Sequence, residues 1–271
     1  MSRLQGAAFE RIDEADAGKH PFGVPSIQAL LGRTLRFMNP VTIFVGENGS
    51  GKSTLLEGIA CAADAIAIGS SDLRRDESLS AGHALSRHMT LSWQTKKSRN
   101  RFFLRAEDFF GYALRIDRMK AELRAEIRVV EEDASLSPAA RGFALLPLQR
   151  SLYDLNALYG EGLDSRSHGE AFLALFQSRM RPDGFYLLDE PEAPLSPTRQ
   201  LTLLSMLRMM VEEQGAQVIM ATHSPIMMAY PGATIYGFDG GDISEVPFDQ
   251  VEHISVMRSF LRDPESFLRY L

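Results

Sequence analysis

The sequence predicts an α/β protein built around a mostly parallel sheet. The first observation is a run of apolar and β-branched residues at 41–45, which a glycine-rich loop and a helix-forming segment follow. The second is the alternation of further short apolar runs, at 185–188 and 218–221, with helical segments. Short apolar strands that alternate with helices are typical of a parallel sheet with helices on both faces.

Composition restricts the chain to a few classes. Its 271 residues suffice for one large α/β domain or two small ones. The net charge of −6 argues against a broadly basic surface that coats nucleic acid. A single cysteine, Cys61, excludes an internal disulfide and a cysteine-rich zinc site. The first 19 residues are polar and no apolar stretch is long enough for a membrane span, so we expect a cytoplasmic protein with no membrane insertion of its own.

The first third of the chain combines strands with two helices. Proline and glycine punctuate residues 1–33, which predicts an irregular lead-in with a short strand near 26–31. Further strands are expected at 34–37, 89–93 and 102–104, and helices at 55–66 and 81–88. The segment 94–101 holds four basic residues and no acidic one, and we expect it at a hairpin tip. It is either a solvated turn or a contact for the phosphate groups of a partner or nucleic acid.

The middle of the chain changes to a helical period. Apolar residues recur every three or four positions from Glu107 to Val130, which predicts a long amphipathic helix. A second helix is expected over 139–158, broken or kinked at Pro147. Downstream, a helix over 197–211, a strand at 234–238 and a final pair of helices after 251 complete the pattern. The helix over 197–211 is expected to turn these side chains inward: Leu201, Leu204, Leu207 and Met210.

The loop after the first buried strand has the spacing of a phosphate cradle. Gly46, Gly51, Lys52 and Ser53 fit the pattern G-x-x-x-x-G-K-[ST]. Glycines, including Gly49, let the backbone turn its N–H groups toward a polyphosphate. The lysine can reach the β- and γ-phosphates, the serine hydroxyl can bind Mg²⁺, and the helix that follows presents its positive end.

Two further strands end in residues that complement this loop. Asp189 and Glu190 follow the apolar run at 185–188, where Asp189 can hold Mg²⁺ and Glu190 can orient the attacking water or accept its proton. His223 follows the strand at 218–221, a position suited to sensing the γ-phosphate. An acidic turn and a structural histidine are the plainer alternatives.

These motifs together resemble those of the ABC-type ATPases. Residues 46–54, 187–191 and 221–225 resemble the Walker A, Walker B and switch-histidine motifs of that superfamily, which includes transporter motors and soluble SMC, RecF and overcoming-lysogenization-defect proteins. The match is most similar to small stand-alone predicted ATPases of the AAA family that carry an S-H-G-E signature. That signature corresponds here to Ser167–Glu170, which is also a capping box for the helix after it.

The resemblance implies one ABC-type domain over residues 1–271, with a mostly parallel core sheet, an antiparallel β portion and a helical lobe at about 107–182 between the two Walker motifs. It implies that ATP and Mg²⁺ are the cofactors and that Lys52, Glu190 and His223 are catalytic. Mg²⁺ would be held by Ser53, Asp189 and, at the Q-loop position, Glu107, for which Gln94 is the alternative. The nucleotide-binding residues that it implies are Gly46, Asn48, Gly49, Ser50, Gly51, Lys52, Ser53, Thr54, Ser167 and Gly169.

The expected activity is Mg²⁺-dependent ATP hydrolysis in a head-to-tail homodimer that sandwiches ATP. Nucleic-acid maintenance or defence, with a nucleic acid or nuclease as partner, is the expected setting. The motor subunit of a membrane ABC transporter is the alternative, and a protein that binds ATP without useful turnover is a third hypothesis.

Two positions depart from the superfamily pattern. Ser196 occupies the place where the D-loop usually has aspartate, and His168 replaces a signature glycine. The aromatic residue that stacks on adenine would be Phe22 or Phe37.

Overall fold

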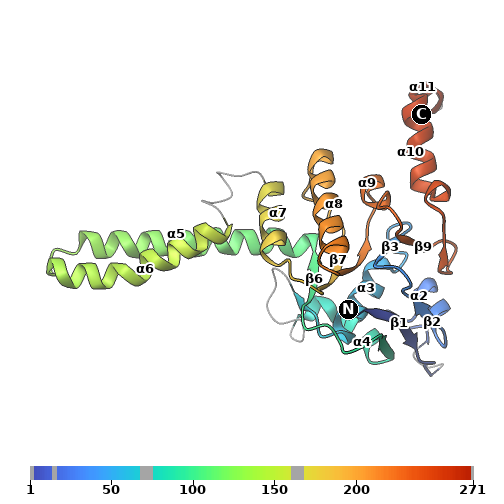
Figure 1. Cartoon of the computed structure of the whole chain (residues 1–271), viewed down its shortest axis with the longest axis horizontal. Helices are drawn as coiled ribbons and strands as arrows, with labels where there is room; N and C mark the ends of the chain where they lie inside the picture. Colours follow the sequence, from blue (N-terminus) through green and yellow to red (C-terminus); the bar gives the residue numbers. More distant parts are fainter. Residues whose placement is uncertain (1–2, 14–16, 68–75, 160–167, 270–271) are drawn as a thin grey trace. The chain divides into compact units, whose positions relative to one another are not determined.

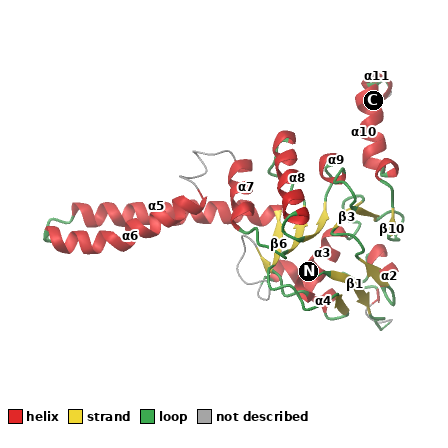
Figure 2. Cartoon of the chain, viewed as in Figure 1, coloured by secondary structure: helices red, strands yellow, loops and turns green. Residues whose placement is uncertain are grey.

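The computed structural model describes residues 3–13, 17–67, 76–159 and 168–269, which form two compact units. The first unit contains Met1–Ala106 and Arg181–Leu271, and the second contains Glu107–Met180. All strands described belong to the first unit, whereas the described part of the second unit is helical (Figures 1 and 2). Among the described residues, no helix has the length and apolarity needed to cross a membrane.

The large sheet determines the architecture of the first unit. Within the described residues it has seven strands in the order β10-β9-β3-β8-β7-β6-β4, all parallel except β10, which runs antiparallel to β9. Its strands are β3 (Val41–Val45), β4 (Ile66–Ala67), β6 (Arg101–Arg105), β7 (Phe185–Asp189), β8 (Gln217–Ala221), β9 (Thr234–Gly237) and β10 (Ser244–Glu245). This order confirms the predicted α/β fold with a parallel-dominated sheet.

A second, antiparallel sheet contains β1 (Leu4–Phe9) between β2 (Thr34–Arg36) and β5 (Met89–Trp93). Helix α3 (Lys52–Ala62) packs against β5 of this sheet and against β7 and β8 of the large sheet. The side chains of Leu55 and Ile59 on α3 are fully buried in the same core cluster as Leu187 and Ile219. The helix therefore joins the two sheets through one hydrophobic core.

Alternation along the strands divides the large sheet into two buried faces. Phe185, Leu187 and Ile219 belong to the core under α3, whereas Leu188 and Met220 are fully buried but lie outside that cluster. Since successive side chains of a strand point to opposite faces, the second set faces the other side of the sheet. Helix α8 (Pro197–Glu212) packs against β8.

The remaining described elements of the first unit are helical. They are α2 (Pro25–Leu30), the 3-10 helix Glu77–Leu79, α4 (Ser80–Ser86), α9 (Pro225–Met228), the 3-10 helix Phe248–Gln250, α10 (Glu252–Arg262) and α11 (Pro264–Leu268). The final pair of helices agrees with the sequence prediction. Helix α3 ends at Ala62 rather than at residue 66, which belongs to β4.

The second unit contains α5 (Ala106–Glu132, which starts at the last residue of the first unit), α6 (Pro138–Tyr159) and α7 (His168–Ser178). Helices α5 and α6 run side by side (Figure 1). Leu123 of α5 and Leu155 of α6 line a common cavity. Asp133 forms the turn between them by accepting a 2.8 Å hydrogen bond from the backbone N–H of Ser135. Edge-to-face packing of Phe109 and Phe172, 5.1 Å between ring centroids, joins α5 to α7.

Four details of the sequence prediction are wrong. The strand expected near 26–31 is helix α2, because Pro25 suits the first turn of a helix, where no backbone N–H is needed. The lead-in also contains β1. Residues 94–101 do not form a hairpin tip, because β5 and β6 belong to different sheets. Of the break or kink predicted at Pro147, the break is wrong, because helix α6 continues through this residue. The carbonyl that loses its partner is that of residue 143, whose side chain is exposed.

The fourth error is the phase of α8. Leu203, Leu207 and Met210 are fully buried, Leu204 is only partly buried, and Leu201 is 55% exposed. Apolar residues occur on more than one side of α8, so the periodicity alone did not indicate which face of the helix is buried.

A buried ion cluster links the end of β6 to the segment before α4. The guanidinium of Arg105, whose side chain is 4% exposed, lies 3.1 Å from Asp76 Oδ2 and 3.5 Å from Glu57 Oε1. Removing Arg105 takes the positive charge away from two carboxylates that are only 13% and 18% exposed. We predict that Arg105→Met lowers the free energy of unfolding by about 3 kcal/mol, measured by urea denaturation.

Arg208→Ala is the matched control, because Arg208 forms an exposed i,i+4 pair with Glu212. Its loss is expected to cost about 0.5 kcal/mol or less. Equal effects of the two substitutions would contradict a stabilising role for the buried cluster.

Candidate active site

The loop after β3 has the backbone that its glycines permit. Gly46 and Gly51 have φ angles of +144° and +98°, which other residues rarely adopt. A Cβ atom at Gly51 would lie 2.6 Å from Ser26 Oγ, so glycine is also required for packing against α2. The hydroxyl of Ser26 donates a hydrogen bond to the carbonyl of Ser50. The loop is therefore fixed at its far end before α3 begins.

Lys52 is buried inside this loop. Its ammonium donates hydrogen bonds to the carbonyls of Gly46, at 2.8 Å, and Glu47, at 2.7 Å. Burial lowers the pKa of Lys52, while the nearby carboxylates of Glu190 and Asp189 oppose that shift. A buried ammonium at this position is suited to a charge-assisted hydrogen bond with a phosphate oxygen.

Ser53 and Asp189 meet across 136 positions of sequence. The hydroxyl of Ser53 donates a 3.0 Å hydrogen bond to Asp189 Oδ1 at the end of β7. One hydroxyl and one carboxylate fit Mg²⁺, which usually takes few protein ligands and completes its shell with water and substrate phosphates. The described residues contain no group of three or more His, Cys, Asp or Glu side chains that could hold a metal alone. The donor set thus fits a metal that arrives with a nucleotide.

Glu190 lies beside this pair in an unusual backbone conformation. Its φ angle is +47°, and its N–H donates a 2.9 Å hydrogen bond to the carbonyl of Ala221 on β8. A left-handed conformation at a residue other than glycine costs about 1–3 kcal/mol and is often found at functional sites. The side chain is 47% exposed, and its Oε1 lies 3.8 Å from Nε2 of His223.

His223 presents a polar atom without a hydrogen-bond partner. Nε2 of the ring is buried and makes no hydrogen bond, although the side chain as a whole is 28% exposed. Burial, and then the charge of Lys52, lower the pKa of His223, which favours the neutral ring. A neutral imidazole with its proton on Nε2 could donate to an oxygen of a bound phosphate.

Sequence reasoning missed three residues that support the turn at His223, namely Glu192, Gln200 and His253. Oε1 of Glu192 accepts hydrogen bonds from the backbone N–H groups of His223, at 2.7 Å, and Ser224, at 3.2 Å. The hydroxyl of Ser224 donates to Gln200 Oε1 at 2.6 Å. His253 of α10 contacts the ring of His223. Only Glu192 had a local signal, as the acidic residue two positions after Glu190.

Other candidate residues lie in varied surroundings. Asn48 and Gly49 are exposed on the loop, while Ser50 and Thr54 are partly buried. Ser167 lies outside the described residues. Gly169, in the first turn of α7, is buried, and Glu107, near the start of α5, is exposed. Both belong to the helical unit, so their roles stay predictions.

The two aromatic candidates for adenine stacking are core residues. Phe22 is 6% exposed and packs edge-on against His88, 5.3 Å between ring centroids. Phe37 is 4% exposed. Both rings are therefore largely buried, and Phe37 also lines a cavity on the antiparallel sheet. Ser196 is exposed at the N-cap of α8 and makes no capping hydrogen bond through its side chain.

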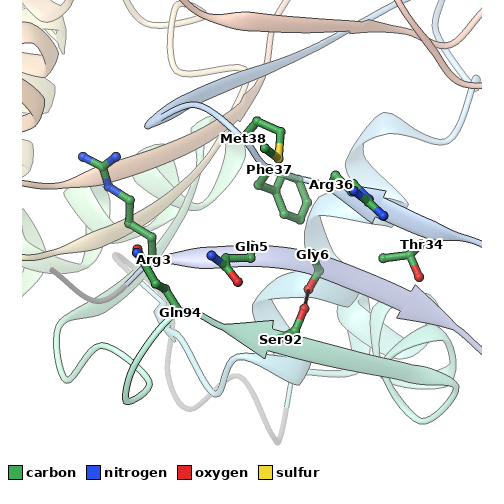
Figure 3. A pocket seen from close by; sticks show the side chains of 9 residues that line it. All are labelled: Arg3, Gln5, Gly6, Thr34, Arg36, Phe37, Met38, Ser92 and Gln94. Carbon is green, nitrogen blue, oxygen red and sulfur yellow. Dashed lines mark hydrogen bonds between the residues drawn. The ribbon is translucent and has the colours of Figure 1, made fainter.

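Gln94 lies away from the phosphate loop. It lines a cavity of about 580 Å³ on the antiparallel sheet, together with Arg36, Phe37 and Met38 (Figure 3). Residues 37 and 38 precede β3, whereas the phosphate loop follows it, and five residues of strand span roughly 16 Å. This separation disfavours Gln94 as the Q-loop residue.

The basic segment 94–101 makes contacts within its own chain. Lys97 pairs with Asp64 at 2.7 Å, and the guanidinium of Arg101 donates to the backbone carbonyls of Ser98 and Asp64. These contacts favour the interpretation of a structural turn.

Comparison with known proteins identifies related sequences and folds. A family model described as "AAA domain, putative AbiEii toxin, Type IV TA system" matches residues 41–166 and 171–229, more than half of the chain. Among curated proteins, no match is found.

The chain is also similar to several solved structures. The protein MJ1267, an ATP-binding cassette of an ABC transporter, superposes with a TM-score of 0.51 at 18% identity, covering 100% of this chain and 99% of the other. At this identity the similarity shows the fold only. cbiO1 from Clostridium perfringens, part of the ABC transporter complex cbiONQ, has a TM-score of 0.47 at 17% identity, covering 99% and 100%. The SMC head domain from Thermotoga maritima has 0.43 at 17% identity, covering 90% and 98%.

We predict that Lys52→Ala weakens ATP binding by about 30-fold, because a charge-assisted contact worth about 2 kcal/mol is lost. The dissociation constant can be measured by isothermal titration calorimetry. Lys97→Ala, which removes an ammonium paired with Asp64 outside the loop, is the control and should leave the constant unchanged. Equal ATP affinity in Lys52→Ala and the native protein would refute the assignment of the phosphate loop.

We further predict that Glu192→Ala lowers kcat about tenfold or more, because two backbone N–H groups that fix the His223 turn lose their acceptor. Glu192→Gln keeps the amide oxygen as an acceptor and should retain kcat within about threefold. Steady-state ATPase kinetics test both variants. If they behave alike, the hydrogen bonds from residues 223 and 224 do not support catalysis.

Proposed function

Since the chain belongs to this AAA-domain family and is a P-loop ATPase, we propose that it hydrolyses Mg²⁺-bound ATP with the residues gathered around its phosphate loop. One observation carries the proposal. Ser53 lies 3.0 Å from Asp189, and His223 lies 3.8 Å from Glu190, so both pairs meet at the carboxyl ends of β7 and β8. Ligands bind at this edge of parallel sheets.

The loop residues position the phosphates. Backbone N–H groups of residues 46–51 and the positive end of α3 surround the polyphosphate, and Lys52 neutralises part of its charge. Ser53 and Asp189 would hold Mg²⁺, and the ion would supply charge stabilisation to the phosphate oxygens.

Glu190 and His223 act on the reacting groups. Glu190 orients a water molecule and accepts its proton as the water oxygen bonds to the γ-phosphorus. The bond between that phosphorus and the bridging oxygen breaks, and ADP and phosphate are released. His223 donates from Nε2 to an oxygen of the transferred phosphoryl group, which satisfies the atom that otherwise makes no hydrogen bond.

We also propose that the active form is a head-to-tail homodimer. Each site would then receive Ser167 and Gly169 from the second copy; of these two, Gly169 lies in the first turn of α7. ATP closes the pair and hydrolysis reopens it, so turnover drives a conformational cycle.

The proposed setting is defence or nucleic-acid maintenance. Its support is the description of the matching family, which names a toxin of a toxin–antitoxin system. The alternative is the motor subunit of a membrane transporter; MJ1267, which has a similar fold, is described as an ATP-binding cassette of an ABC transporter. A transporter role requires a separate membrane subunit to bind this chain.

We predict that Glu190→Gln keeps ATP binding but lowers kcat by about 100-fold or more, because the amide cannot accept the proton of water. A phosphate-release assay measures turnover, and calorimetry measures binding. Glu213→Gln, a change at an exposed residue after α8, is the control. Native turnover in Glu190→Gln would exclude Glu190 as the base.

The same variant tests the dimer and its setting. Light scattering should show that Glu190→Gln is a dimer when ATP and Mg²⁺ are present. Without nucleotide, the same variant should be a monomer. A monomer in both conditions would exclude the ATP sandwich. Tagged protein in this state should retain a nucleic acid or a nuclease; retention of a membrane subunit would instead establish the transporter alternative.

A further inference from the structure

The C-terminal helix α10 reaches the proposed catalytic histidine. Nε2 of His253 lies 3.5 Å from Nδ1 of His223, and the two rings are edge-on, with centroids 5.3 Å apart. His253 lies outside the loop, the β7 turn and the β8 turn that supply the other site residues. The contact therefore brings a fourth segment of the chain to the site.

The two ring nitrogens of His223 face different groups. Nδ1 faces His253, whereas Nε2 is buried, makes no hydrogen bond and points toward the carboxylate of Glu190, 3.8 Å away. A neutral imidazole has one proton, and the hydrogen bond made by one nitrogen decides which nitrogen carries it. If Nδ1 accepts a hydrogen bond from His253, the proton of His223 must be on Nε2.

We infer that His253 is a positioning residue, whose Nε2–H fixes the ring orientation and the tautomer of His223. This inference rests on the proposed function, because it assigns to His223 the donation from Nε2 to a phosphate oxygen. His253 itself does not touch the reacting atoms. Without it, the ring of His223 can carry its proton on either nitrogen and can rotate about its side-chain bonds.

The fold holds His253 in place from one side. Its neighbours Val251 and Ile254 are 3% and 5% exposed, which anchors the first turn of α10 in the core. On the other side, His253 lines a cavity of about 530 Å³ with Glu47 of the phosphate loop and with Val256, Met257 and Phe260 of its own helix. The rest of α10 is more open: Leu261 is 69% exposed. The first turn is therefore the part of this helix that packs against the rest of the first unit.

Two variants separate positioning from packing. Glutamine has an amide nitrogen three bonds from Cβ, the same number as Nε2 of histidine, whereas asparagine has its amide nitrogen at the position of Nδ1. We expect His253→Ala and His253→Asn to lower kcat about tenfold with KM for ATP unchanged within twofold. The reason is that hydrolysis needs the oriented ring of His223, whereas ATP binding does not. His253→Gln should restore kcat to within about threefold of the native value.

Arg258→Ala is the control on the same helix, because Arg258 forms an exposed pair with Asp249. It should leave kcat and KM unchanged. In a His223→Ala background, His253→Ala should have no further effect on kcat, since the group that it positions is absent. Equal kcat in the Asn and Gln variants, or a further tenfold loss in the double variant, would overturn the inference.

A measurement that does not use activity separates this inference from the proposed function. Long-range ¹H–¹⁵N spectra of the imidazole rings should show His223 as the Nε2–H tautomer in the native protein and as a mixture in His253→Ala. A native Nδ1–H tautomer would refute the positioning role. If the native protein does not hydrolyse ATP, the proposed function fails, while the spectra still decide whether His253 orients His223.

Discussion

The parallel register of β3, β8 and β7 is the constraint on which the site depends. Phe44 pairs with Ala221, and Ala221 pairs with Asp189, so three strands end at one level of the sheet. The turns that follow them carry Lys52, Glu190 and His223. A shift of one residue in any of these pairings would move its turn by about 3.3 Å and reverse the faces of the strand. Because both faces are buried and close-packed, such a shift would also change which side chains fill each core.

This constraint extends into the turns themselves. The N–H of Glu190 bonds to the carbonyl of Ala221, and the N–H of Thr222 bonds to the carbonyl of Phe44. The ladder thus continues one residue beyond the strands and stabilises the left-handed conformation of Glu190. Glu192 then fixes the next turn through the backbone of residues 223 and 224. Backbone contacts, more than contacts between side chains, set the distance between Glu190 and His223.

Sequence reasoning located the strands and the local motifs because each depends on neighbouring residues. The run at 41–45 and the glycine spacing after it predict β3 and the loop without further information. The α/β class followed from the same kind of pattern. Helix α2 was missed because its signal, a proline at the first turn and three buried residues, is short. The helix continues through Pro147, where a break was one of the two predicted outcomes. The backbone carbonyl that loses its hydrogen bond there, that of Phe143, lies on the side of the helix that is open to solvent.

Partners that are far apart in sequence could not be predicted in this way. Position 253 is 30 residues from His223, and Gln200 is 24 residues from Ser224. Nothing in the spacing of these residues distinguishes them from solvated side chains of amphipathic helices. Strand order was equally inaccessible, and so β5 and β6 were paired with each other rather than assigned to two sheets. Local chemistry predicts which groups a site needs, whereas the tertiary fold decides which other groups orient them.

The site also contains polar atoms that the fold leaves unsatisfied. Nε2 of His223 and Oε2 of Glu192 are buried without hydrogen-bond partners, and each such atom costs about 1–3 kcal/mol. The surrounding strands bury large apolar side chains on both faces, for example Phe44 and Tyr186, and this burial offsets the cost. A buried donor that lacks a partner gains most from a ligand that supplies an acceptor. In the proposed function, the stability lost at His223 would be recovered as affinity for an anion that reaches its Nε2.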